Sequence, residues 1–191
     1  PVAVDVSGIG SAQTFSNVFV GLDHSCALAT DNLLFCWGSG SQGKLGDGLN
    51  TNSNIPVAVD VSGLPVPDQT FKDLHTRNYH TCAISNNDNA FCWGNGSFGK
   101  LGNNATAHAS TPVALDTTNM TGATQFTQIA VGRDHSCGLA TDSLLYCWGR
   151  NNVGALGDGN MSTDQDLPVA VDISGISVPD RSFTKIASHS Y

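Results

Sequence analysis

The sequence contains no glutamate and few charged residues of any kind. Only 13% of its 191 residues are charged, against roughly 25% in an ordinary soluble domain, and Lys and Arg together number 8. The net charge of −8 therefore comes from aspartate. This balance excludes a basic nucleic-acid-binding domain, which would need many Lys and Arg side chains to neutralise phosphates, and it also excludes a disordered polyelectrolyte.

Long apolar runs are also absent. No run approaches the ~20 apolar residues that a membrane-spanning helix needs, so we expect no membrane span. Gly, Asn, Ser and Thr, in contrast, make up over a third of the chain. These residues favour turns, caps or strands over helix. The composition therefore predicts an all-β fold with many short loops.

A repeat of 55 to 56 residues organises the sequence. The motif Pro-Val-Ala-(Val/Leu)-Asp divides the chain into three complete units, 1–55, 56–111 and 112–167, and a partial fourth unit, 168–191. A phenylalanine that opens an apolar stretch, His-(Ser/Thr)-Cys, Cys-Trp-Gly and Leu-Gly recur at the same step. Five motifs in register indicate duplicated structural units. The motifs start at Pro1, Pro56, Pro112 and Pro168, and the phenylalanines are Phe15, Phe71, Phe126 and Phe183.

Each unit contains several candidate strands. In the third unit, residues 126–132, 135–140 and 144–148 are apolar over strand lengths, and the Pro-Val-Ala segment is a fourth candidate. Three-residue turns separate the second and third candidates of every unit, as in a β-hairpin. Four short strands per unit are typical of a propeller blade. The turns are residues 30–32, 86–88 and 141–143.

The order of these motifs resembles the repeat of the regulator of chromosome condensation family. The pattern is Phe-x-x-(Ile/Val)-x-x-Gly-x-x-His-(Ser/Thr)-x-Ala-Leu, a hairpin, Leu-x-x-Trp-Gly, Gly-x-Leu-Gly and Pro-Val, and its copies cover the whole chain. The resemblance implies blades of a β-propeller, usually seven in that family. Two departures, His75-Thr76-Arg77 in the second unit and Gly138 in the third, concern the geometry of local turns and not the fold.

Three complete units and part of a fourth are too few to close a ring of seven blades. An open arc would leave strand edges unpaired, and the sequence stops at Tyr191, one residue before the next expected histidine. We therefore expect the missing neighbours to be further repeats of the same protein or neighbouring copies of it.

Six cysteines form three pairs, each ten residues apart across a predicted hairpin. Opposed residues of antiparallel strands bring their Cβ atoms to about 4.5–5.5 Å, so we predict one disulfide in each unit. Free buried thiols are one alternative. A zinc site using His-x-Cys is another, although it would lack the second close pair of ligands found in structural zinc sites. Disulfides in every unit indicate an oxidising compartment, hence an extracellular or cell-surface protein. The pairs are Cys26 and Cys36, Cys82 and Cys92, and Cys137 and Cys147.

The repeated histidines, His24, His80 and His135, have Asp and Ser beside them in two units. Adjacent residues of a strand point to opposite faces, so these neighbours cannot form a catalytic triad with the histidine. We interpret the histidines as structural, bonded to backbone near blade junctions, with a pH-sensitive role as the alternative.

The repeated tryptophans, Trp37, Trp93 and Trp148, each follow a cysteine and have apolar neighbours. We expect them to pack between successive blades. Sugar stacking is the alternative, and it would need an exposed ring.

Four Asn-x-(Ser/Thr) sequons lie in predicted surface loops, at Asn95, Asn104, Asn119 and Asn160. Chance alone would produce about this number, but their placement suits N-glycans in a secreted eukaryotic protein, and we predict a glycan on at least one.

No motif for catalysis or cofactor binding occurs in the sequence. Asp47-Gly48 and Asp158-Gly159 are interpreted as turn residues, because no loop carries the spaced oxygen ligands of a calcium site. We therefore predict no enzyme activity, no cofactor and no metal.

Together these features predict a non-catalytic extracellular repeat scaffold that mediates protein-protein contacts, as a structural component of a surface or filamentous assembly. One alternative is a secreted propeller that binds or inhibits a protein partner, as a member of the same propeller group inhibits β-lactamases. Another is the intracellular nucleotide-exchange role of the resembled family, which the paired cysteines disfavour. The expected contact surface is formed by loops that vary between units: 39–42, 95–98 and 150–153 after Trp-Gly, and 48–55, 104–111 and 159–167 after Leu-Gly.

Overall fold

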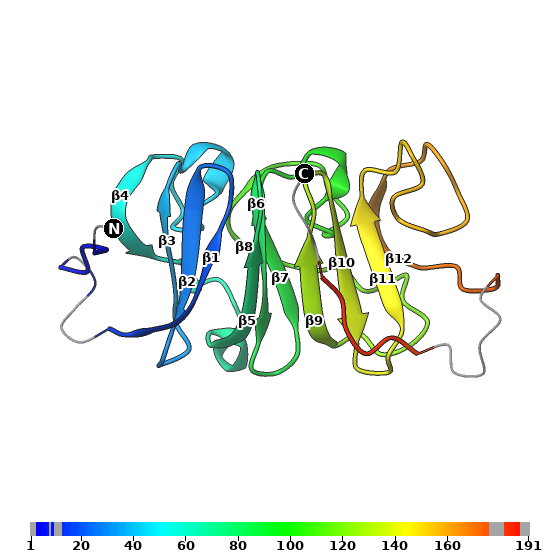
Figure 1. The fold of residues 1–191 in the computed structure, drawn as a ribbon, viewed down its shortest axis with the longest axis horizontal. Helices are drawn as coiled ribbons and strands as arrows, with labels where there is room; N and C mark the ends of the chain where they lie inside the picture. Colours follow the sequence, from blue (N-terminus) through cyan, green and yellow to red (C-terminus); the bar gives the residue numbers. More distant parts are fainter. Residues whose placement is uncertain (1–2, 8, 10–12, 176–181, 188–191) are drawn as a thin grey trace.

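The computed structural model of the chain describes residues 3–7, 9, 13–175 and 182–187. Within these ranges, three four-stranded antiparallel sheets stand side by side (Figure 1). Blade 1 contains β1 (Phe15–Val20), β2 (His24–Ala29), β3 (Leu34–Gly38) and β4 (Ser53–Ala58). Blade 2 contains β5 (Phe71–Thr76), β6 (His80–Ser85), β7 (Ala90–Gly94) and β8 (Ala109–Ala114). Blade 3 contains β9 (Phe126–Val131), β10 (His135–Ala140), β11 (Leu145–Gly149) and β12 (Gln165–Ala170). Three short 3-10 turns are η1 (Ser41–Gly43), η2 (Val66–Asp68) and η3 (Ser97–Gly99).

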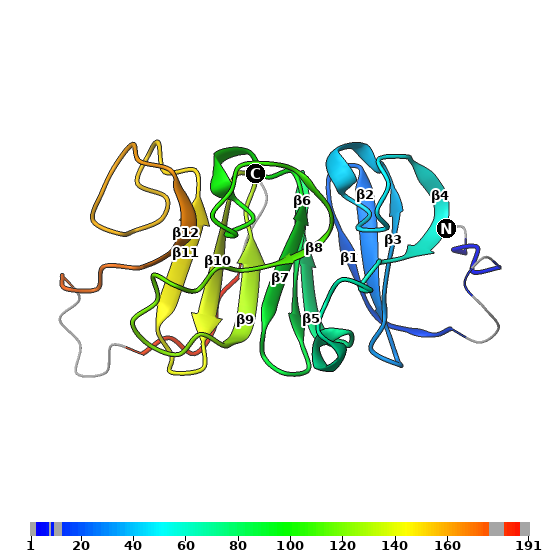
Figure 2. The same cartoon turned by 180° about the vertical axis from the view of Figure 1, so that it is seen from behind.

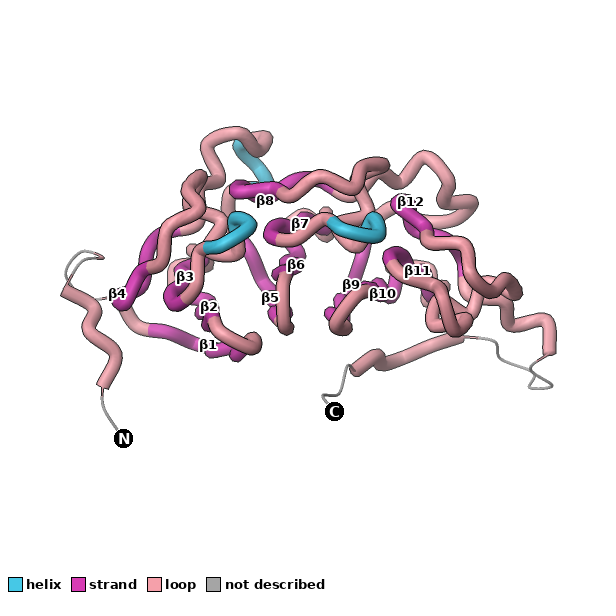
Figure 3. The backbone as a smooth tube through the Cα atoms, turned by 90° about the horizontal axis from the view of Figure 1, so that it is seen from above, coloured by secondary structure: helices cyan, strands magenta, loops and turns pink. Residues whose placement is uncertain are grey.

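The three blades fan out as in part of a propeller. Their first strands, β1, β5 and β9, lie on the concave side, and their last strands, β4, β8 and β12, lie on the convex side (Figure 3). The connections after β4 and β8 return from the outer edge of one blade to the inner edge of the next (Figure 2). The predicted all-β fold with four strands per repeat is confirmed.

The Pro-Val-Ala motif forms the last strand of a blade. Pro56 lies in β4, Pro112 in β8 and Pro168 in β12. A blade therefore starts at the phenylalanine of one sequence unit and ends at the Pro-Val-Ala motif that opens the next unit.

The hairpin between the second and third strands is the same in every blade. Its third turn residue has a left-handed backbone, with φ of 68° at Asn32, 68° at Asp88 and 67° at Ser143. The amide of that residue donates a 3.0 Å hydrogen bond to the last residue of the preceding strand. This is the geometry of a three-residue hairpin loop, for which Asn and Asp are well suited. The predicted turns are thus present.

The hydrophobic core lies between blades rather than within one sheet. One cluster joins blades 1 and 2 through residues such as Leu45, Phe71 and Trp93, and the other joins blades 2 and 3 through Leu101 and Trp148. Every residue of β6, in the central blade, is buried. Consecutive blades therefore stabilise each other, as expected for a repeat protein. No helix in the described ranges is long and apolar enough to cross a bilayer.

Candidate interaction surfaces and blade junctions

A disulfide links β-strands two and three of every blade, as the spacing predicts. In each case the two cysteines are directly opposite in the strand register, and their Cα atoms are 4.0 to 4.1 Å apart. These bonds leave the cysteines unable to act as zinc ligands. The disulfides are Cys26–Cys36, Cys82–Cys92 and Cys137–Cys147.

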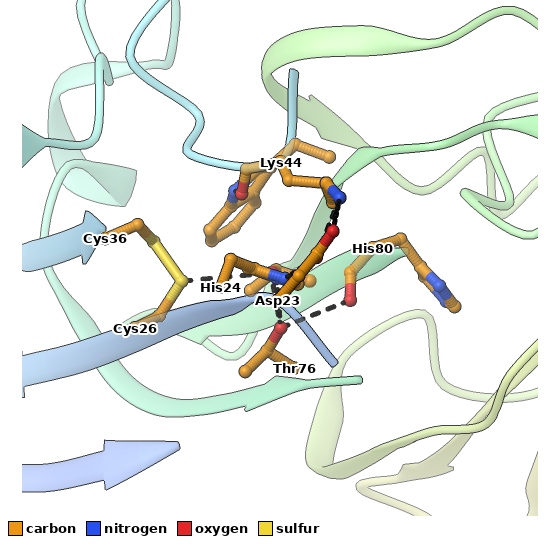
Figure 4. Close-up of a disulfide and its surroundings, with 9 residues drawn as sticks. Asp23, His24, Cys26, Cys36, Lys44, Thr76 and His80 are labelled. Carbon is orange, nitrogen blue, oxygen red and sulfur yellow. Dashed lines mark hydrogen bonds and ion pairs between the residues drawn. A yellow bond between two sulfur atoms is a disulfide. The ribbon is translucent and has the colours of Figure 1, made fainter. Parts of the chain in front are cut away.

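His24 connects blade 1 to blade 2 next to the first disulfide (Figure 4). Its Nε2 lies 2.6 Å from Oγ1 of Thr76 and 3.2 Å from Oγ1 of Thr81, both in blade 2. The Thr76 hydroxyl in turn donates to the carbonyl oxygen of His80. The histidine therefore lies at a blade junction as expected, but the prediction of a backbone partner was wrong. Its partners are hydroxyl groups of the next blade.

His80 repeats this connection from blade 2 to blade 3. Its Nε2 lies 2.7 Å from Oγ of Ser136. Because the Ser136 hydroxyl donates to the carbonyl oxygen of Lys100, His80 is the donor to Ser136. A serine beside a histidine resembles a nucleophile and its base, but both residues are fully buried. His80 Nδ1 also has no hydrogen-bond partner among the described residues, so no third group orients the ring.

The three repeated histidines are held neutral. Burial, reinforced by the nearby Lys44 charge, lowers the pKa of His24 to about 4. Burial also lowers the pKa of His80 well below its usual range and lowers the pKa of His135. Since a neutral imidazole carries one N–H donor, His24 and His80 each supply one hydrogen bond to the next blade, whereas His135 lies partly buried on the flank of blade 3.

Two of the three repeated tryptophans bind the backbone of the preceding blade, whereas Trp37 is half-buried and lies beside Phe15 of its own blade. Nε1 of Trp93 donates to the Lys44 carbonyl at 3.2 Å, and Nε1 of Trp148 donates to the Lys100 carbonyl at 2.9 Å. Both side chains are fully buried, so they pack between blades and are not available for sugar stacking. A Cβ at Gly102 would lie 2.8 Å from Nε1 of Trp148. The glycine of the Leu-Gly motif thus makes room for the next blade's indole.

Two buried lysines at equivalent positions pair differently. Nζ of Lys44 lies 2.8 Å from the carboxylate of Asp23 in its own blade. Nζ of Lys100 lies 2.7 Å from the carboxylate of Asp134 in the next blade, because Tyr79 takes the place of the aspartate in blade 2. We did not predict this pair. Its signal is visible in the repeat: Lys44, Lys100 and Ala155 are equivalent, as are Asp23, Tyr79 and Asp134.

The predicted variable loops after Trp-Gly gather at one end of the blades. The η1 and η3 turns of blades 1 and 2 lie at the upper end in Figure 1. Phe98, in η3, is 38% exposed and has a positive φ of 65°, as Gln42 has in η1 (63°). The same backbone geometry therefore presents a different side chain in blade 1 and in blade 2.

The free flank of blade 3 carries the beginning of a further repeat. The amide of Phe183 donates to the Ser143 carbonyl at 3.2 Å, the same bond that Phe71 makes to Asn32 and Phe126 makes to Asp88. Residues 183 and 185–187, with His135, Cys137 and Leu145, line a cavity of about 710 Å³. Residues 176–181 and 188–191 of the partial unit lie outside the described ranges.

Three of the four sequons are exposed, at Asn104, Asn119 and Asn160. Asn95 is not. It is only 8% exposed, its Nδ2 donates to Oε1 of Gln42 at 2.9 Å, and its Oδ1 accepts from the amide of Ser97. The expectation that Asn95 lies in an exposed loop was wrong, because the neighbouring blade covers its amide.

The aspartates of the Asp-Gly loops accept hydrogen bonds from backbone amides two residues further along the chain. Asp47 accepts from the amide of Leu49, and Asp158 accepts from the amide of Asn160. In the described part of the chain, no three His, Cys or Asp side chains come together as a metal site would require.

Comparison with known proteins identifies the repeat. The sequence pattern of the Regulator of chromosome condensation (RCC1) repeat matches residues 31–84, 87–139 and 142–191, and a second pattern of that name matches 15–44 and 126–155. Human E3 ubiquitin-protein ligase HERC2 is 31% identical over 145 residues, which are 75% of this chain and 3% of HERC2. The ultraviolet-B receptor UVR8 of Arabidopsis thaliana is 30% identical over 154 residues, which are 81% of this chain and 33% of UVR8. The chain thus spans a third or less of these relatives.

Solved structures show the same fold. Human WBSCR16 superposes with a TM-score of 0.73 at 24% identity, over 90% of this chain and 42% of that protein. Prp20p from Saccharomyces cerevisiae superposes with a TM-score of 0.71 at 19% identity, over 85% of this chain and 39% of Prp20p. The matched patterns, the four-stranded blades and these superpositions together place the chain in the RCC1 repeat family, as a run of propeller blades.

Proposed function

We propose that this chain is a non-catalytic part of an extracellular or cell-surface propeller that mediates protein-protein contacts as a structural component of a surface or filamentous assembly. The observation that carries the proposal is the buried disulfide at the same place in each of three blades. Such bonds persist in oxidising compartments and are rare in the cytosol. RCC1-repeat propellers generally bind proteins, and the loops that vary between the blades are the natural contact surface.

The assembly role is supported by the way the blades bind one another. Each junction uses the same elements: a histidine bonded to a hydroxyl, a tryptophan bonded to a carbonyl and a glycine that accommodates the indole. The flank of blade 3 presents part of this set again, with residues 182–187 beside it. A further repeat of the same protein, or a neighbouring copy, is the partner that fits this flank.

Two other roles fit the same fold. A secreted propeller that binds or inhibits one protein partner would use the same loops without assembling. An intracellular exchange factor is the role that the family suggests, and Prp20p itself has binding properties to Gsp1p and histones. The disulfides disfavour the intracellular role.

Thiol mapping of the natural full-length protein tests the compartment. Intact cells would be lysed in acid to stop exchange, and the protein would be alkylated with a maleimide reagent before and after reduction. We expect the six cysteines to react only after reduction. Free thiols in the untreated protein would refute the extracellular role and favour the intracellular one.

Crosslinking on the cell surface tests the assembly. A dihydrazide that couples carboxylates suits a chain with 16 acidic residues and few lysines. A ladder of self-linked copies is the expected result. A single crosslink to one different protein, with no self-linked species, would refute assembly and support the binding or inhibitor role.

A further inference from the structure

Three of the eight Lys and Arg side chains of this acidic protein gather at the junction between blades 2 and 3. Lys100, Arg133 and Arg150 line one cavity of about 390 Å³, and Asp134 is the only carboxylate in its lining. Phe98 is the exposed aromatic residue of the same cavity. The local charge balance is therefore positive, while the net charge of the protein is −8.

The guanidinium groups of Arg133 and Arg150 form no hydrogen bond with Asp134. Nε of Arg133 lies 3.7 Å and Nη1 of Arg150 lies 3.6 Å from Oδ2 of Asp134, distances that exceed a normal hydrogen bond. Their side chains are 71% and 41% exposed. Neither guanidinium donates a hydrogen bond to any described residue. Asp134 instead accepts from the buried Lys100, so the guanidinium donors remain available to a ligand.

Phe98 positions one of these guanidinium groups. Its ring centroid lies 4.8 Å from Cζ of Arg150, a distance typical of a cation–π contact. The same ring is 5.5 Å from Nζ of Lys100. Because Phe98 is part of the η3 turn and Arg150 follows β11, the contact joins blades 2 and 3 and orients the guanidinium group of Arg150.

The equivalent junction between blades 1 and 2 lacks this charge. Gln42 occupies the position of Phe98, Asn78 that of Arg133 and Asn95 that of Arg150. Both junctions form with the same histidine, tryptophan and glycine contacts, so the fold does not require the phenylalanine or the two arginines.

We propose that Arg133, Arg150 and Phe98 form a binding site for a short acidic segment of a protein partner. Two carboxylates of the segment would pair with the two guanidinium forks, which suit bidentate carboxylate binding, and an apolar side chain between them would contact the Phe98 ring. A nucleic acid fits less well, because a long polyanion would meet the acidic surface around this small positive site. The proposal deepens the protein-binding role proposed above and depends on it.

A peptide titration tests the site. The probe is a capped, fluorescently labelled peptide with four Glu residues around one Leu, and the control peptide carries Gln in place of each Glu. We expect the acidic peptide to bind the full-length protein at least about tenfold more tightly than the Gln peptide. Arg133→Asn combined with Arg150→Asn should weaken this binding about tenfold, a loss of ~1.4 kcal/mol.

A second double variant controls for net charge. Lys72→Asn combined with Lys185→Asn removes the same charge at two exposed lysines that do not line the 390 Å³ cavity and should change the peptide affinity by less than about twofold. The arginine variants are expected to fold, since asparagine stands at both positions in the preceding repeat. Phe98→Gln, which copies Gln42, should also weaken binding.

Each other outcome overturns the proposal. Equal binding of both peptides, or no binding of either, would exclude a carboxylate site. Equal losses in the two double variants would show that net charge alone attracts the peptide. Displacement of the peptide by inorganic phosphate near the peptide's own dissociation constant would identify a phosphate site instead. None of these results changes the thiol map, so failure of this site and failure of the proposed compartment are distinguishable.

Discussion

Lys100 forms an ion pair with Asp134 of the next blade, whereas Lys44, at the equivalent position, forms one with Asp23 of its own blade. The difference follows from two substitutions in the repeat. Blade 2 has Tyr79 where blade 1 has Asp23, so Lys100 has no aspartate partner in its own blade. Blade 3 has Ala155 where blade 1 has Lys44, so Asp134 has no lysine partner in its own blade, and Lys100 and Asp134 pair with each other. The carbonyl oxygen of Lys100 also accepts from Trp148 and Ser136. One residue of blade 2 thus makes three bonds to blade 3, and the blades are not interchangeable.

Removing the Lys100 ammonium should loosen the junction that it spans. Hydrogen bonds to charged groups contribute about 1.5–3 kcal/mol, so Lys100→Met is expected to destabilise the protein by about this amount. Hydrogen exchange should rise in both β6 and β10. Lys44→Met is the matched control, because its partner lies in blade 1, and it should raise exchange in blade 1 alone. Identical exchange patterns for the two variants would contradict the cross-blade role.

The disulfide of the central blade should contribute roughly 2.5–3 kcal/mol, the value expected for closing a loop of about ten residues. Cys82→Ala combined with Cys92→Ala tests this by denaturant unfolding under non-reducing conditions. Peptide mapping without reduction should show three linked peptides, each joining cysteines of one blade. Links between blades would refute the pairing.

Gly102 should not tolerate a side chain. Its φ of 68° is unfavourable for alanine, at a cost of about 1–2 kcal/mol, and the added Cβ would clash with Trp148, for about 1–3 kcal/mol more. Gly102→Ala should therefore destabilise the protein by about 2–5 kcal/mol. Gly63→Ala is the control, since nothing lies within 4 Å of a Cβ there, and its unfolding midpoint should hardly change. A neutral Gly102→Ala would show that the indole can move aside.

Acid should weaken the blade junctions between pH 6.5 and 4. The pKa of His24 is about 4 in the folded protein and about 6.5 in the unfolded chain. The unfolded chain therefore takes up its proton first, and stability falls as the pH drops through this window, by on the order of 3 kcal/mol for His24.

The variant His24→Gln tests this pH dependence. Glutamine keeps a donor for Thr76 but does not titrate, so the variant should lose less stability between pH 7 and pH 4. Asp23 contributes in a lower pH window than His24. Burial opposes the shift, but the Lys44 ammonium lowers the pKa of Asp23, so its contribution is lost only below the ordinary pKa of an aspartate. An unchanged pH profile in His24→Gln would show that other groups control acid unfolding.

N-glycans are predicted at the exposed sequons and not at the buried one. In material from a eukaryotic surface, glycosidase treatment should shift the mass, and site mapping should find glycan on at least one of Asn104, Asn119 and Asn160. Asn95 should be unmodified, because its Nδ2 is bonded to Gln42. Unmodified asparagine at all four positions would remove this support for an extracellular role.

Features that depend on residues close together in sequence could be predicted without the structure. The repeat period, the strands, the three-residue hairpins and the disulfides all follow from local patterns. A cysteine pair ten residues apart across a three-residue turn has little freedom, since the strand register brings Cys82 and Cys92 opposite each other. The repetition of the same spacing in three units made this prediction stronger than one copy would have.

The partners across blade junctions were decided by the tertiary structure. His24 meets Thr76, Lys100 meets Asp134, and Asn95 is covered by Gln42, and in each case the two residues are more than 30 positions apart. The sequence determined which side chains every blade carries, because that pattern repeats along the chain. Which blade supplies the partner depends on how consecutive sheets pack. A change at one repeat position, such as Tyr79 in place of an aspartate, is enough to pair the lysine of one blade with the aspartate of the next.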